Sequence, residues 1–152
     1  MSCEKTVTLN NLTDASSLDL TFNRKMAMVV VEITGADVST LNSLTVESPN
    51  PDNNITFETH DPKITAYKDA INENMFSAII APGSKNSEAL LCTLSLSNST
   101  EKSLKLQSDI NFEAGKKYTF TYNMSSASRG SGSAPTRSAS PDNLTLVSVD
   151  PM

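Results

Sequence analysis

The chain has 152 residues, of which 38% are apolar and 19% charged, and its formal net charge is −5. A chain of this size is expected to form one domain with an apolar core of its own. Nucleic-acid-binding proteins present a basic face, so the acidic balance excludes nucleic acid as a partner.

The N-terminal residues 1–17 are expected to form an arm ahead of the folded domain. Cys3 lies in the sequence Met-Ser-Cys-Glu-Lys, which resembles the end of a bacterial lipoprotein signal without its apolar stretch. Two interpretations remain open. Cys3 is an ordinary terminal thiol, or it is the acylated first residue of a mature lipoprotein and Met1 is an internal start. On the second, one lipid chain would anchor the protein only marginally.

Segments rich in strand-forming residues recur at intervals of roughly ten residues along the chain. Met26–Thr34 is apolar on both faces, which predicts a central strand. Many short strands favour an all-β fold, a single antiparallel two-sheet β-sandwich of Greek-key type over residues 18–124. The predicted strands are Thr6–Leu9, Leu18–Phe22, Met26–Thr34, Leu44–Glu47, Ile55–Glu58, Ile64–Tyr67, Phe76–Ala81, Leu90–Ser97, Leu104–Gln107, Lys117–Met124 and Leu144–Val149.

The segment Lys63–Met75 is ambiguous, because Ile64, Tyr67, Ile71 and Met75 are also spaced for one short amphipathic helix. Thr65 and Tyr67 favour a strand followed by a loop, which we adopt. The turn before Lys117–Met124 is expected to use Gly115. Cys92 is expected on a buried strand face. The alternating residues predict a core that contains Phe22, Met28, Val30, Ile79, Leu94, Leu96, Leu106, Phe120 and Tyr122.

Chemistry-bearing residues are sparse. The single histidine, His60, stands beside Asp61 without a nucleophile or an orienting geometry, and is expected to be a solvated loop residue. One histidine with two distant cysteines cannot form a zinc site, and the acidic residues between Asp52 and Asp61 lack the spacing of a calcium loop. The sequence therefore predicts no catalytic, cofactor-binding or metal site, no cofactor, and a protein that is not an enzyme.

Three motifs in order carry a family resemblance: FNRKMAMVVVEI early, FSAIIAPG at Phe76–Gly83 and FEAGKKYTFTYNM at Phe112–Met124. Together they resemble the N-terminal-type domain of the fimbrillin-like family of Bacteroidetes surface and pilus proteins. The resemblance implies a transthyretin-like sandwich and a structural subunit or accessory protein of a fimbria. Its partners would be other fimbrial subunits or itself, at the bacterial cell surface, outer membrane or fimbrium. Contact with a membrane would come only through a lipid anchor.

The C-terminal residues 144–152 predict one more strand after a flexible linker at residues 125–143. This strand can complete its own sheet or add to the edge of a neighbouring subunit, and the resemblance points to the second option, β-strand complementation. Its apolar residues, the candidate donors, are Leu144, Leu146, Val147 and Val149. Arg129 and Arg137 in the linker are candidate processing sites. The alternative is a non-polymerising surface lipoprotein that binds a host-surface or glycan ligand through its loops.

Overall fold

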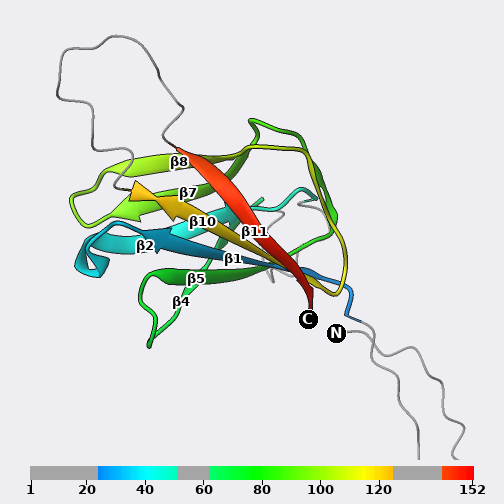
Figure 1. The fold of residues 1–152 in the computed structure, drawn as a ribbon, viewed down its shortest axis with the longest axis horizontal. Coiled ribbons are helices and arrows are strands. Elements are labelled where there is room, and N and C mark those ends of the chain that lie inside the picture. Colours follow the sequence, from blue (N-terminus) through cyan, green and yellow to red (C-terminus); the bar gives the residue numbers. More distant parts are fainter. Residues whose placement is uncertain (1–23, 51–61, 125–141) are drawn as a thin grey trace, which may run out of the picture.

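The computed structural model describes residues 24–50, 62–124 and 142–152 (Figure 1). Nine of the strands in these ranges form one sheet, in the order β3-β2-β7-β8-β11-β10-β1-β5-β4, while β6 and β9 pair separately. A 3₁₀ turn, η2 (Val38–Thr40), joins β1 to β2. The strands are β1 (Ala27–Thr34), β2 (Leu41–Glu47), β3 (Lys63–Thr65), β4 (Tyr67–Lys68), β5 (Met75–Ile80), β6 (Gly83–Lys85), β7 (Leu90–Leu96), β8 (Glu101–Leu106), β9 (Ile110–Phe112), β10 (Lys116–Asn123) and β11 (Asn143–Pro151).

The expectation of an all-β fold is confirmed, but that of an antiparallel two-sheet sandwich is not. β1 lies between β10 and β5, central as predicted, yet it runs parallel to β10 from Met28 opposite Lys117 to Thr34 opposite Asn123. β11 pairs with both β10 and β8. It therefore joins one layer of strands, β10, β1, β5 and β4, to the other layer, β8, β7, β2 and β3. The strands therefore make one large sheet that is nearly barrel-shaped rather than two separate sheets.

The two ends of this sheet, β3 and β4, follow each other directly in the chain. The chain changes sides at Ala66, whose N–H donates to the Leu44 carbonyl of β2 at 2.8 Å, whereas Tyr67 already pairs with Ser77 of β5. This short crossing brings the open edges of the sheet together. It also settles Lys63–Met75 as strand followed by a turn, the adopted prediction, and not as a helix.

The core confirms six of the predicted side chains, namely Val30, Leu94, Leu96, Leu106, Phe120 and Tyr122. Two predictions, Met28 and Ile79, have the wrong face. On β1 the main cluster takes Ala27, Val29, Val31 and Ile33, while Val30 is buried on the other face and Met28 is partly exposed. Ile79 is 45% exposed, because its neighbours Ala78 and Ile80 face inward instead. Phe22 lies outside the described residues. A strand that is apolar on both faces has no alternation of apolar and polar residues to show which side faces the core.

The turn before β10 is confirmed at Gly115, whose φ is +78°. Its N–H donates to the Met26 carbonyl at 2.8 Å, and its carbonyl accepts from the N–H of Met152 at 2.9 Å. This one residue therefore links the turn to the start of β1 and to the end of β11. Cys92 is fully buried on β7, as predicted. Strands β6 and β9 were not predicted, because three residues carry too little pattern.

Candidate functional site: the C-terminal strand

Strand β11 has one nearly complete partner. It runs antiparallel to β10, from Pro151 opposite Lys116 to Thr145 opposite Thr121. The register shifts between the Ser148 and Leu146 pairs, so Val147 is an extra residue and forms a bulge. Along this edge β11 is an ordinary member of its own sheet.

The other edge of β11 is short of partners. β8 runs parallel to it at only two positions, Asn143 and Leu144, helped by a hydrogen bond of 2.9 Å from the Lys105 N–H to the Asp142 carbonyl. Beyond Leu144 the two strands diverge, as Figure 1 shows. Within the described part of the chain, no strand pairs with this edge from Thr145 to Pro151. An unpaired edge of this kind can accept another strand.

The predicted donor residues divide between core and surface. Leu144 is 1% exposed and belongs to the core, next to the end of β10. By contrast, Leu146 (37%), Val147 (59%) and Val149 (46%) are exposed. Besides its pairing with β10, the strand is thus held by one buried leucine at its start, and it exposes three apolar side chains along the rest of its length.

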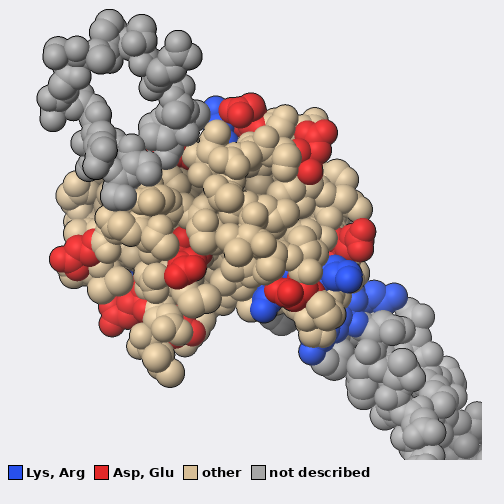
Figure 2. All heavy atoms as spheres, viewed as in Figure 1, with Lys and Arg blue, Asp and Glu red and all other residues tan. Residues whose placement is uncertain are grey.

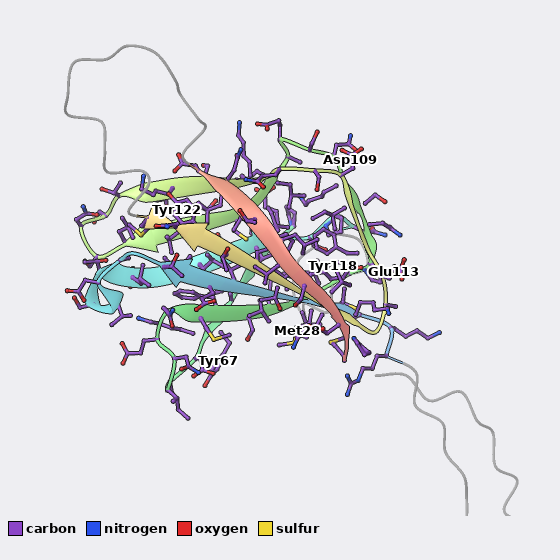
Figure 3. All side chains as sticks on the ribbon, in the orientation of Figure 1. Met28, Tyr67, Asp109, Glu113, Tyr118 and Tyr122 are labelled. Atoms are coloured by element: carbon purple, nitrogen blue, oxygen red, sulfur yellow. The ribbon has the colours of Figure 1, made fainter. Side chains whose placement is uncertain are left out.

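Polar contacts fix both ends of β11. Tyr122, near the end of β10, donates its hydroxyl proton to Asp142 Oδ1 at 2.8 Å, and Lys102 Nζ lies 3.7 Å from the same oxygen. Burial and the neighbouring Asp142 carboxylate raise the pKa of Tyr122 above its ordinary value, so the phenol stays protonated as a donor. At the far end Lys117 lies 3.8 Å from Asp150. Figure 3 shows Tyr122 where β10 ends and β11 begins.

Several sequence-predicted residues lie outside the described residues: Cys3, His60, Arg129, Arg137 and the acidic group at Asp52–Asp61. Among residues 24–50, 62–124 and 142–152, no three histidine, cysteine or acidic side chains are close enough to hold a metal ion. None of the helices in these ranges is long and apolar enough to cross a membrane.

Sequence reasoning missed a second surface feature, at the β4–β5 margin. Ile71 in the turn is 91% exposed, and Tyr67 on β4 is 65% exposed beside a cavity of about 340 Å³. The sequence signal for this turn was Asp69, because an aspartate side chain often accepts a hydrogen bond from the backbone N–H two residues later and so forms a turn.

The family model described as fimbrillin-like matches residues 6–138. The chain belongs to the fimbrillin-like family. This confirms the resemblance stated from the three motifs. Comparison with curated proteins found no match.

Solved structures of two proteins have a similar fold. One is the tip fimbrial protein Mfa3 of Porphyromonas gingivalis with a C-terminal truncation, at a TM-score of 0.52 and 8% identity over 86% of this chain. The other is a proposed cell adhesion protein of Bacteroides uniformis, at a TM-score of 0.50 and 14% identity over 87% of this chain. The fimbrillin-like chain spans about half of each, 52% of their length. At these identities the likeness establishes a shared fold.

Proposed function

We propose that this fimbrillin-like chain is a structural subunit or accessory protein of a bacterial surface fimbria. The observation that carries the proposal is the family match over residues 6–138. A tip fimbrial protein and a proposed adhesion protein with the same fold support it. The protein would act at the cell surface or in the fimbria, through contacts with other subunits, and we expect no catalytic activity.

Assembly by β-strand complementation is the finer part of the proposal, with β11 as the strand given to a neighbour. Two features of β11 support it: its second edge pairs with β8 at only two residues, and Leu146, Val147 and Val149 are exposed along it. Arg129 and Arg137 precede β11 in the sequence, so cleavage at either would cut the covalent link between β10 and β11. Exchange requires β11 to leave β10 and take Leu144 out of the core.

A disulfide lock tests this proposal. Thr121 and Thr145 are opposite each other in the antiparallel register, where Cα atoms lie about 4.5–5.5 Å apart, a separation that suits a disulfide. In a Cys3→Ser background, oxidised Thr121→Cys/Thr145→Cys should form no ladders or fibres, and reduction should restore them. Electron microscopy and denaturing gels give the readout. Equal assembly in both redox states would contradict strand exchange, and absence of assembly in either would favour the non-polymerising surface lipoprotein.

Lipidation of Cys3 stays a separate proposal, motivated by the Ser-Cys-Glu-Lys context. It predicts that the codons upstream of Met1 encode basic residues and an apolar stretch ending just before Cys3. Mass spectrometry of protein from native cells should then find acyl chains on Cys3. A stop codon or a polar stretch upstream would refute it.

A further inference from the structure

The turn between β4 and β5 presents an isoleucine to solvent on a fixed backbone. Asp69 Oδ1 accepts hydrogen bonds of 2.8 Å from the N–H groups of both Ile71 and Asn72. The Asp69 N–H in turn donates to the Met75 carbonyl at 2.9 Å, which closes the turn. Ile71 is 91% exposed at the tip. In Figures 1 and 2 this turn projects from the body at the lower left, with acidic atoms beside it.

An apolar hollow lies on the same margin, at the other end of β5. It has a volume of about 340 Å³. Its lining includes the side chains of Met28, Ile64, Thr65, Tyr67, Ser77 and Ile79. Figure 3 shows Met28 and Tyr67 on this lower margin. A cavity of about 150 Å³ admits benzene, so this hollow has room for an isoleucine side chain.

The hollow exists because β4 covers only part of the β5 edge. β4 pairs with β5 at Ser77 and Phe76 alone. The Met75 carbonyl points toward the β4 side, where it accepts from Asp69, so strand alternation directs the N–H and C=O of Ile79 to that side as well. β4 has no residue opposite Ile79. The backbone N–H and C=O of Ile79, which β4 does not pair, therefore lie beside the apolar side chains of the hollow.

The charges at the two features are opposite. Asp69 and Glu73 flank Ile71, and the two N–H bonds to Asp69 lower the pKa of its carboxyl, which keeps it ionised. Lys68 precedes the turn, but its ammonium donates to the Leu41 carbonyl at 2.9 Å.

At the hollow, Lys117 is the register partner of Met28 on β10, although it also lies 3.8 Å from Asp150. Arg24 and Lys25 are exposed at the start of β1, three or four residues before Met28. Figure 2 shows basic atoms at the lower right, where the chain enters β1, with fewer acidic atoms among them.

We propose that a second copy of this chain inserts its Ile71 into the hollow. Since the turn and the hollow lie at opposite ends of β5 on one margin, a two-fold arrangement lets each copy supply one turn and one hollow. Burying two isoleucines and matching acidic turns to basic rims both favour this pair. The contact does not involve β11, so it stands apart from strand complementation.

Two variants, each of which replaces an isoleucine with aspartate, test the pairing. Ile71→Asp removes the inserting side chain, and Ile79→Asp places a carboxylate in the hollow; both residues are exposed, so both variants should fold. The matched control is Ser99→Asp in the exposed β7–β8 turn, where the φ of +64° tolerates aspartate. All variants are made in the oxidised Thr121→Cys/Thr145→Cys, Cys3→Ser chain, so strand exchange cannot contribute.

Sedimentation velocity over a concentration series should show a reversible dimer for the parent chain and Ser99→Asp. Each of the other two should lower the association constant at least tenfold, the effect of removing one buried isoleucine contact per copy. Raising the salt should weaken the parent dimer. A monomeric parent at millimolar concentration, or an Ile71→Asp or Ile79→Asp variant that associates like the parent, would overturn the proposal.

Discussion

The hydroxyl of Tyr122 and the carboxylate of Asp142 meet at 2.8 Å, which joins the end of β10 to the residue before β11. The two residues are 20 positions apart in sequence. The Asp142 carboxylate also lies 3.7 Å from the Lys102 ammonium, and the Asp142 carbonyl accepts a hydrogen bond from the Lys105 N–H. One aspartate thus ties β11 to both β10 and β8, at the place where the sheet passes from one layer to the other.

Removing this hydroxyl should loosen the start of β11. Tyr122→Phe keeps the buried ring and loses the hydrogen bond to Asp142, so the free energy of unfolding should fall by about 1–2 kcal/mol. Urea denaturation measures the change. Tyr67→Phe, at an exposed tyrosine, is the control and should alter stability by less than about 0.5 kcal/mol. Equal effects of both variants would mean that the Asp142 contact contributes nothing.

Stability should fall steeply in alkali because burial raises the pKa values of Cys92 and Tyr122. Their ordinary values are 9.0 and 10.0, so above these the unfolded chain loses protons that the folded chain retains. The unfolded state then binds fewer protons and is favoured as pH rises, by about 1.4 kcal/mol per pH unit for each group.

Unfolding free energies of the Cys3→Ser chain between pH 8 and about 10.5 check this sign. Adding Cys92→Ala should flatten the decline that begins near 9.0, and adding Tyr122→Phe should flatten the part above 10.0. A decline of the same slope in all three proteins would show that other groups cause it.

Phe120 should be among the most costly positions to truncate. It is fully buried, and its ring centroid lies 6.4 Å from that of Phe112. Phe120→Ala should lower the unfolding free energy by roughly 3–5 kcal/mol. Ile79→Ala, on a side chain that is 45% exposed, should cost less than about 1.5 kcal/mol. Similar costs at the two sites would contradict the assignment of faces.

Gly115 should resist substitution for conformational reasons alone. Its φ is +78°, while a Cβ there would meet only the Arg24 Cβ at 4.0 Å. Gly115→Ala should therefore cost about 1–2 kcal/mol through backbone strain. Gly115→Asn should cost less, since asparagine enters the left-handed region more readily. Thermal unfolding of the two variants distinguishes strain from crowding, which would penalise the larger asparagine more.

Local patterns in the sequence were sufficient for most of the described strands, all but β6 and β9, and for much of the core. The predicted strands Thr6–Leu9, Leu18–Phe22 and Ile55–Glu58 lie outside the described residues. Tyr118, Phe120 and Tyr122 alternate with small polar residues, and such a strand has only one side that can face the core. The turn at Gly115 was equally accessible, because few residues adopt its conformation. The three family motifs were also visible in the sequence alone.

The exposed sites were less accessible. Leu146, Val147 and Val149 carry the same apolar signature as Leu144, and sequence cannot say which of them the rest of the sheet covers. The adopted prediction placed Ile71 in a loop without a role, and Ile79 was counted toward the core. Their exposure follows from where β4 leaves β5, which depends on the pairing of β3 with β2.

The sequence by itself determined the all-β class, the family and the segments that become strands, because period, propensity and turn residues act over a few neighbours. Only the tertiary structure decided the parallel pairing of β1 with β10, the passage of β11 between two layers and the inward face of β1. These depend on contacts between residues far apart in sequence. Residues 28 and 117 pair across 89 positions, and nothing local to either specifies its partner or its direction.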